Sequence, residues 1–421
     1  MSGTDHSNIA TRRALLLAGC VATVAYAVPA SADTRTEVVV SGGVGVENNP
    51  FLGARDGDGD DDGLAFAAEL MVEPSFYIED ERSTFRLYGN ARLRQFFDRY
   101  DTTGSLTLGA DGSTRIDERT SLSSGARFIT SRDAAQEALR FDGQDLNGLD
   151  PGVLPTVPII DPTIAGTSGR FTSYGANASL TRQLSPQDSG TVNVAFEESR
   201  IAGDIGLDTR TADIGLGYAR RLSERTSVIA NLGFSRSDLL GRSAGDAITL
   251  TPLVGLQQQV SERLNWSGQV GLSHSRIDDG LGGDIKDTSL ALAFNACRRD
   301  LRGTLCISAQ QQPRATTFGG LSNSTAVTLG YDAKISRRDS IGVNASYRKS
   351  NRISSQPLLD LPVSEEDELI GVGGTFRRTF TDRLSGFVSA SYAKLNSDLF
   401  PDQSANIAGY VGLSYYFGRR R

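Results

Sequence analysis

The sequence is poor in the residue types on which most enzymes and metal sites depend. Its 421 residues include 2 histidines, 3 cysteines and 1 tryptophan. His6 lies in an N-terminal leader, and His274 falls near the outer end of an expected strand. A hydrolase needs a nucleophile beside a base, and a catalytic zinc needs histidine, cysteine or carboxylate ligands. The sequence offers neither grouping, so it predicts a protein that is not an enzyme.

A basic stripe and long apolar runs are also missing. The 43 basic and 50 acidic residues are well mixed and give a net charge of −7, so no basic stripe indicates nucleic-acid binding. The mean hydropathy is −0.25. The one apolar run, Ala14–Ala27, is too short for a membrane-spanning helix. No helical stripe of leucine and alanine follows residue 32, which argues against a helical soluble fold.

The first 32 residues have the three parts of a secretory signal peptide. Arg12–Arg13 supplies a positive flank, Ala14–Ala27 is apolar, and Ala30–Ala32 is a small-residue cleavage site. The mature chain is expected to begin at Asp33. Export through the inner membrane and the lack of helices leave a closed barrel as the way for this chain to cross a bilayer.

Two other interpretations of the leader remain open. Leu17–Cys20 resembles a lipoprotein cleavage box, which would place a lipid on Cys20. The apolar run continues past this cysteine, however, and few apolar residues precede it. Thr11–Arg13 gives a fainter indication of twin-arginine export.

A repeated hairpin is the main feature of residues 33–417. Short polar turns that resemble one another alternate with longer, dissimilar loops rich in glycine, aspartate and proline. Short turns on one side and long loops on the other are typical of an outer-membrane barrel whose short turns face the periplasm. The spacing predicts an all-β, antiparallel, up-and-down transmembrane barrel of about 18 strands, within a range of 16–20. The eight turns are 79–83, 117–120, 185–188, 223–226, 261–264, 300–303, 336–339 and 381–383.

Each expected strand alternates apolar and polar residues. In 212–218, Ala212, Ile214, Leu216 and Tyr218 share one face, and an aspartate and two glycines share the other. The apolar set is expected to face lipid and the polar set an aqueous lumen, because a one-residue slip would reverse every side chain. A soluble sandwich also alternates but would not keep one turn type at one end. The same alternation occurs in 228–235, 290–296, 327–334 and 341–348.

The last expected strand carries a second signal. Leu413, Tyr415 and Phe417 close an alternating apolar series that ends on an aromatic residue. This ending resembles the C-terminal signal by which the barrel-assembly machinery recognises its clients. Residues 418–421, a glycine and three arginines, depart from that pattern and are interpreted as a basic periplasmic tail.

The layout resembles the outer-membrane β-barrel porins of the exopolysaccharide-associated type. The resemblance rests on a first strand, Val38–Val46, that runs into Glu47–Phe51 and an Asp/Gly loop, and on hairpins such as Arg220–Ser227. It covers most of residues 36–417, and its motifs are architectural. The resemblance implies a barrel in the outer membrane and an association with polysaccharide export or envelope permeability.

Charged residues on neighbouring strands are predicted to face the lumen, because an arginine in lipid at mid-depth would cost roughly 2–4 kcal/mol. Two interpretations remain open. Opposed acidic and basic walls would set a field across a pore and select solutes, or the charges pair with one another and fill the interior. This predicted charge ladder consists of Glu69, Glu73, Arg86, Arg92, Arg94 and Arg127.

The longest loop, about 133–169, contains apolar residues that need cover. It folds into the mouth and narrows the lumen, caps the rim, or forms a disordered tip; the sequence leaves all three open. The residues of this candidate constriction are Leu154, Val157, Ile159, Ile160 and Ile164.

Two further groups are candidates for structural bonds. Cys297 and Cys306 flank a turn, both on the lumen face, and the periplasm is oxidising, so we expect a disulfide between them. Asp58, Asp60 and Asp62 have the spacing of a calcium loop, but no helices flank them. A solvated acidic loop is the main interpretation there, with weak calcium binding as the alternative to having no cofactor.

The sequence therefore predicts an integral protein of the bacterial outer membrane, with both termini and the short turns in the periplasm. A passive channel for small hydrophilic solutes is the first functional hypothesis. A barrel for exopolysaccharide secretion or surface assembly, working with polysaccharide-export proteins, is the alternative. The expected surroundings are outer-membrane lipid and lipopolysaccharide.

Overall fold

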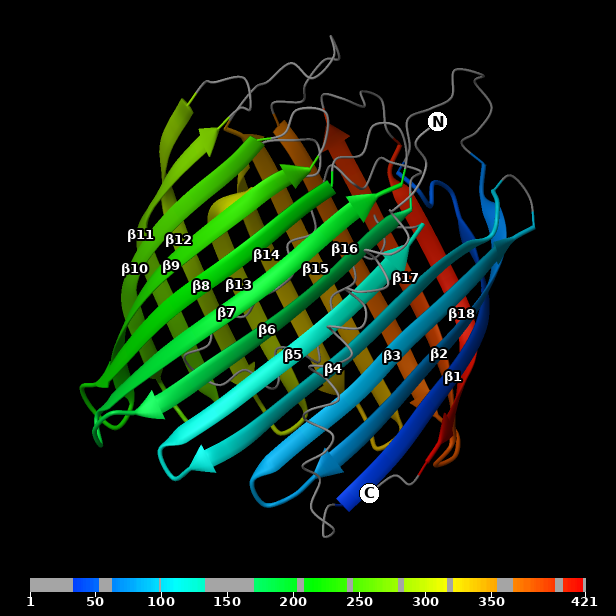
Figure 1. Cartoon of the computed structure of the whole chain (residues 1–421). Coiled ribbons are helices and arrows are strands. Elements are labelled where there is room, and N and C mark those ends of the chain that lie inside the picture. The colour runs from blue at the N-terminus through cyan, green and yellow to red at the C-terminus, as the bar shows by residue number, and fades with distance from the viewer. Residues whose placement is uncertain are drawn as a thin grey trace, which may run out of the picture.

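The computed structural model of the chain is an all-β barrel (Figure 1). It describes residues 33–52, 63–97, 100–132, 170–202, 208–240, 245–278, 284–315, 321–353, 366–397 and 404–418. Within these ranges no helix is long and apolar enough to cross a membrane. The predicted signal peptide with Cys20, the acidic loop and the loop 133–169 lie outside the described residues.

The barrel has 18 strands, as the hairpin count predicted. Every strand pairs antiparallel with its neighbours in the chain, and the first strand pairs with the last. The strands are β1 Asp33–Glu47, β2 Ala65–Glu79, β3 Ser83–Phe96, β4 Thr103–Asp117, β5 Thr120–Ser131, β6 Phe171–Gln183, β7 Asp188–Ile201, β8 Asp208–Arg221, β9 Thr226–Leu240, β10 Gly245–Gln259, β11 Leu264–Asp278, β12 Asp284–Arg299, β13 Gly303–Ala315, β14 Leu321–Lys334, β15 Asp339–Arg352, β16 Glu366–Thr379, β17 Leu384–Ser397 and β18 Asn406–Phe417.

The short turns recur because one side chain organises most of them. In the turn before β7, the Ser185 hydroxyl accepts the N–H groups of Gln187 and Asp188, at 3.1 and 3.0 Å. Such a local bond offers the backbone a ready-made turn. Serine, threonine or aspartate acts in the same way at Asp80, Asp117, Ser223, Ser261, Ser336 and Thr381.

Both ends of the barrel wall lie at the short-turn end. Asp33, at the start of β1, pairs with Glu79, which precedes the first short turn. Phe417, at the end of β18, pairs with Val38 of β1. An even number of strands produces this arrangement, because each hairpin returns the chain to the side from which it started.

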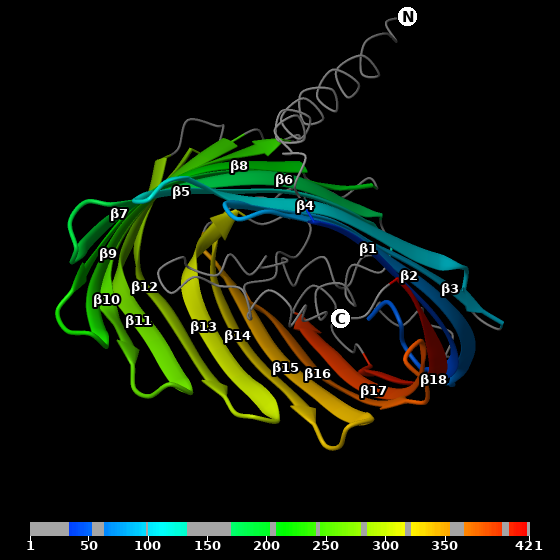
Figure 2. The same ribbon diagram turned by 90° about the horizontal axis from the view of Figure 1, so that it is seen from below.

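The two faces of each strand differ as the alternation predicts. On β8 and β9 the side chains of Ile214, Leu216, Leu232 and Phe234 are exposed on the outside of the barrel. At the alternate, inward positions beside them lie Asp213, Gly215 and Gly217 of β8 and Asn231, Gly233 and Ser235 of β9. Figure 2, seen along the barrel, shows the strands arranged as a ring. The outer surface is therefore apolar and the lining polar.

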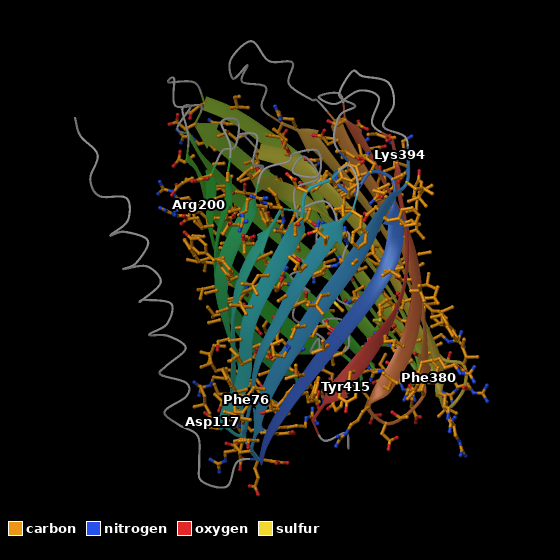
Figure 3. The ribbon with its side chains drawn as sticks, turned by 90° about the vertical axis from the view of Figure 1, so that its right-hand side faces the viewer. Phe76, Asp117, Arg200, Phe380, Lys394 and Tyr415 are labelled. Atoms are coloured by element: carbon orange, nitrogen blue, oxygen red, sulfur yellow. A yellow bond between two sulfur atoms is a disulfide. The ribbon has the colours of Figure 1, made fainter. Side chains whose placement is uncertain are left out.

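Aromatic and charged residues mark the two ends of the outer surface. Phe76, Phe380 and Tyr415 lie toward the short-turn end, and Arg200 and Lys394 toward the opposite end (Figure 3). Aromatic residues at one boundary of an apolar band are typical of membrane barrels. On β18, Leu413, Tyr415 and Phe417 are exposed on the outer face, where the assembly signal places them; recognition by the assembly machinery stays a prediction.

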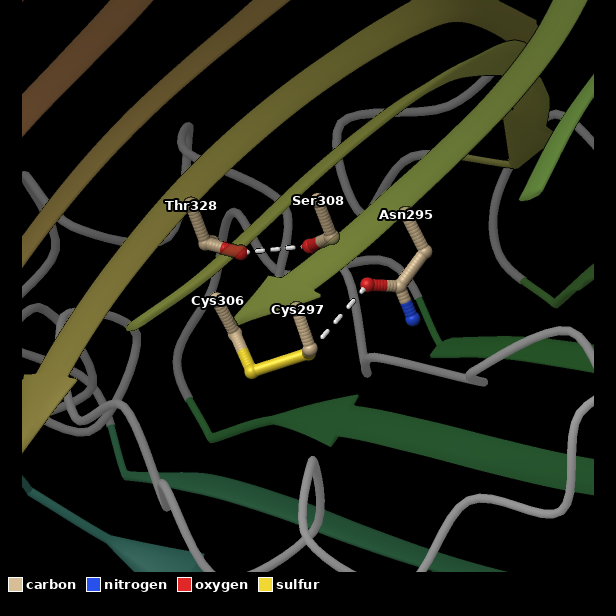
Figure 4. Close-up of a disulfide and its surroundings, with 5 residues drawn as sticks. All are labelled: Asn295, Cys297, Cys306, Ser308 and Thr328. Atoms are coloured by element: carbon tan, nitrogen blue, oxygen red, sulfur yellow. Dashed lines mark hydrogen bonds between the residues drawn. A yellow bond between two sulfur atoms is a disulfide. The ribbon is translucent and has the colours of Figure 1, made fainter. Parts of the chain in front are cut away.

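Cys297 of β12 and Cys306 of β13 form a disulfide (Figure 4). They are direct partners in the β12–β13 register. Beside them, the hydroxyls of Ser308 and Thr328 share a hydrogen bond of 2.6 Å, which links β13 to β14. Covalent and polar bonds thus tie these three strands together near the short-turn end.

The two faces of β9 lead to a testable difference. Leu232→Arg places a charge on the outer face, and in a bilayer we expect it to lower the free energy of unfolding by roughly 2–4 kcal/mol. Ser235→Arg, on the inner face of the same strand, is the matched control and should cost clearly less. Urea titration of the barrel in lipid vesicles, followed by tryptophan fluorescence, measures both. Equal losses would contradict the assignment of the faces.

Candidate functional site

A charged cluster lines the inner wall at β2 and β3. Glu69 of β2 and Arg94 of β3 are direct cross-strand partners. Arg92 approaches the same Glu69 carboxylate, with Nη2 at 2.5 Å and Nε at 2.7 Å. Arg94 Nη2 lies 3.4 Å from it. Three of the six residues of the predicted charge ladder therefore meet in one ion-pair cluster.

The cluster continues to the seam where the barrel closes. Arg94 Nη1 lies 3.1 Å from the carboxylate of Glu47, at the end of β1. Asn406 and Tyr410 of β18 donate hydrogen bonds to the same carboxylate, at 2.7 and 2.9 Å. Arg94 is 2% exposed and Glu47 is 0% exposed. A buried polar clamp thus joins β3, β1 and β18 at the end opposite the short turns.

The other predicted ladder residues face inward but enter different contacts. Glu73 accepts a hydrogen bond of 2.8 Å from Asn90 and does not join the arginines of the cluster. The Arg86 guanidinium lies over the ring of Tyr88, at 4.6 Å from its centre. Arg86 is also the cross-strand partner of Asp111 on β4. Glu73 and Arg86 therefore contact nearby side chains on the wall and lie outside the ion-pair cluster.

Arg127 of β5 stands apart from the cluster. Its cross-strand neighbours on both sides are glycines, Gly109 of β4 and Gly175 of β6. Its buried Nε has no hydrogen-bond partner among the described residues. The Tyr88 side chain covers Gly109, so the space beside Arg127 is partly filled. Arg127 is thus a cationic side chain on the inner face that lies outside the ion-pair cluster.

Some contributors to the inner wall are not predicted by the sequence. Glu47 ends the first strand, and the alternation of β1 puts it on the inner face, but the sequence does not indicate its partners. Its partners Asn406 and Tyr410 lie some 360 positions away in the chain. Nothing local connects β1 to β18, so this clamp becomes visible only when the barrel closes.

The candidate constriction residues and the candidate calcium ligands fall outside the described residues. Of the part that the structure describes, no group of three or more histidine, cysteine, aspartate or glutamate side chains could hold a metal ion. What the described inner wall offers is a polar surface on which Glu47, Glu69, Arg92 and Arg94 pair with one another. Such a surface can pass and weakly select solutes.

Comparisons with known proteins give structural likeness without a family. No family model matches the chain, and no curated protein matches it. The FrpB iron transporter from Neisseria meningitidis (F5-1 variant) superposes with a TM-score of 0.45 at 8% identity, over 88% of this chain and 64% of its own. OccK2 (OpdF) from Pseudomonas aeruginosa, in complex with glucuronate, gives 0.42 at 11% identity, over 92% and 99%. OccAB2 from Acinetobacter baumannii gives 0.42 at 11%, over 92% and 98%. This chain thus spans about two thirds of the FrpB chain.

The polar clamp predicts an unequal response to losing an arginine. Arg94→Met leaves the buried Glu47 carboxylate without its cation, which should cost about 3–5 kcal/mol of unfolding free energy. Arg276→Met breaks the exposed pair with Asp284, 2.6 Å apart, and should cost far less, because solvent screens an exposed ion pair. Denaturant titration of both variants measures the difference. A clamp that contributes nothing would leave the two variants alike.

Proposed function

We propose that the protein is a passive channel of the bacterial outer membrane for small hydrophilic solutes. The observation that carries this proposal is the combination of a closed 18-stranded barrel, an apolar outer face and a polar inner face. Barrels of 16–18 strands generally enclose an aqueous channel. A sheet with this distribution of side chains is stable when lipid covers the outside and water fills the inside.

The ends of the barrel support one orientation. Short turns and both ends of the wall share one side, and that side faces the periplasm in outer-membrane barrels. At the opposite end, Arg200, Arg210 and Arg236 lie on the outer face, in ion pairs with Glu198 and neighbouring aspartates. We propose that this end contacts the phosphate-rich head groups of lipopolysaccharide, since guanidinium groups bind phosphate well.

The pairing of the inner charges implies weak selectivity. Glu47, Glu69, Arg92 and Arg94 together carry two negative and two positive charges and hold one another. Arg127 is not among them, and its inward-facing charge is one that a passing ion would experience. We propose solute passage governed mainly by size, with a modest preference for anions.

The second candidate function is a barrel for polysaccharide secretion that works with export proteins. One arrangement favours it: Tyr77, Arg86 and Tyr88 place aromatic rings and a guanidinium together on the inner face near the short turns. Flat rings of this kind offer an apolar face beside polar groups, the combination that a passing sugar chain needs. This role requires partner proteins, whereas the channel requires none.

Conductance separates the two candidates. The purified mature chain in a planar lipid bilayer should give steady current steps without any partner. Arg127→Glu should shift the reversal potential in a salt gradient toward that of the cation, because a negative lumen concentrates cations. Lys394→Glu, with the same charge change on the outer face, is the control and should leave it unchanged.

Correct folding is checked in the same sample by heat-modifiable mobility in gels. A folded barrel that stays silent would overturn the channel and favour the secretion role.

A further inference from the structure

The hydrogen-bond ladder of the barrel stops part-way along one seam. β12 pairs with β13 from Arg299↔Thr304 up to Leu292↔Gln311, and the described residues beyond that row do not pair with each other. The strands themselves continue, to Asp284 on β12 and to Ala315 on β13. Residues 284–291 of β12 therefore have β11 as their neighbour on one side and lack β13 on the other. An unpaired strand edge is unusual in a membrane barrel, where closure removes edges.

A proline accounts for the position of this break. At the turn, the Asp300 N–H donates a hydrogen bond of 2.8 Å to the Gly303 carbonyl, so Asp300 and Gly303 are a hydrogen-bonded pair. In an antiparallel ladder, hydrogen-bonded pairs alternate with pairs that share no backbone hydrogen bond. The odd-numbered residues of β13 are therefore the ones whose backbone groups point toward β12. Pro313 would fall in such a row opposite Leu290, but it has no N–H to donate. The ladder ends at the row before it.

Two other prolines show that a missing donor alone does not open a seam. Near Pro74 the β2–β3 ladder skips two residues and resumes at Ser75↔Tyr88. Near Pro252 the β10–β11 ladder also skips two residues and resumes at Leu250↔His274. At Pro313 the ladder with β12 does not resume. Something else holds the upper part of β13 away from the wall.

That part of the sheet folds into the barrel. Leu321, at the start of β14, is 2% exposed and packs in one apolar cluster with Ala247 of β10 and Ile277 of β11, next to Ile285 of β12. These three partners lie on the inner face of the wall. In the alternation of β14, Leu321 belongs to the same face as Leu329 and Tyr331, which face outward nearer the short turns. The outer face of the β13–β14 tip thus rests on the inner face of β10–β12, and Figure 2 shows the end of β13 inside the ring and apart from β12.

The tip brings a charge into the lumen, and some polar atoms in and beside it are unsatisfied. Arg314 of β13 attracts Asp213 on β8 electrostatically. Three buried polar atoms lack hydrogen-bond partners among the described residues: Ser289 Oγ of β12, Gln310 Nε2 of β13 and Asn323 Oδ1 of β14. Buried polar groups are normally satisfied, so the folded-in position is not a fully optimised contact. The disulfide Cys297–Cys306 lies lower on the same seam and keeps the paired half of the ladder together.

We propose that the upper β13–β14 hairpin, residues 311–315 and 321–324, is a gate that moves between this folded-in position and a position in the wall paired with β12. The proposal rests on the channel function for its consequence: folded in, the tip narrows the lumen, and in the wall it widens the lumen and completes the sheet. Pro313 weakens the wall position by one hydrogen bond, and the apolar cluster at Leu321 stabilises the other. The short-turn half of the seam, stapled by the disulfide, is the fixed base of the motion.

Engineered cysteine pairs trap each position. Ile277→Cys with Leu321→Cys should cross-link readily, since these residues pack together in the folded-in position. The second pair is Ser289→Cys with Arg314→Cys. These two positions become direct cross-strand partners only if the β12–β13 register continues beyond Leu292↔Gln311. Like Cys297 and Cys306, they would then face each other at a pair without backbone hydrogen bonds. We expect both pairs to cross-link under mild oxidant, the second more slowly, as seen by mass spectrometry of peptides. Failure of the Ser289–Arg314 pair to form under any oxidant would overturn the gate.

Conductance of the same samples tests the consequence. The cross-linked Ser289→Cys/Arg314→Cys barrel should conduct more than the same barrel after reduction, and the cross-linked Ile277→Cys/Leu321→Cys barrel should conduct less. The wild type with and without reductant controls for the native disulfide. Pro313→Ala, which restores the donor, should raise the conductance, and Pro252→Ala, at a seam that already resumes, should not.

The cross-linking readout needs no current. A pair that forms in a non-conducting barrel would uphold the movement while refuting the channel. Cross-linked barrels with conductance equal to their reduced forms would overturn the gate while leaving the channel in place.

Discussion

The structure depends on one constraint: in hydrocarbon, each backbone N–H and C=O must find a partner within the protein. A sheet meets this requirement by closing on itself, and this sheet does so by pairing β1 with β18 over Val38–Glu47. Closure in turn fixes the alternation, because each side chain then faces either lipid or the interior. The even strand count and the shared side of both ends follow from the same closure.

Two seams show how closure is secured. At β1–β18, which joins the two ends of the chain, the hydroxyl of Ser41 donates a buried hydrogen bond of 2.8 Å to that of Ser414, and Glu47 binds both β18 and β3. At β12–β13 the paired rows are fewer, and a disulfide lies among them. Extra bonds therefore occur at the seam with no local loop and at the seam where Pro313 shortens the ladder. At β1–β18 the extra bonds hold together two strands that are far apart in the chain. At β12–β13 they add to a backbone ladder with fewer paired residues.

Features with a local cause could be predicted from the sequence. The strand number, the turns and the inward or outward parity all arise from residues a few positions apart, such as Ser185 with Asp188 or Leu216 beside Gly217. Features that join distant strands could not. The Glu47 clamp needs the β1–β18 register, and the effect of Pro313 depends on which neighbour its nitrogen faces. The inner charges were predicted to face the lumen, but whether they opposed or paired required the geometry, which places Glu69 against Arg92 and Arg94.

The central claim is that outward side chains meet lipid and inward ones meet water. Spin labels placed singly at consecutive positions 228–235 of β9 in a bilayer test it directly, because oxygen collides with labels in lipid and a water-soluble nickel complex with labels in water. The account predicts that the two accessibilities alternate with a period of two residues and out of phase, with Leu232 and Phe234 positions in lipid. Uniform access of the nickel complex to all eight positions would contradict it.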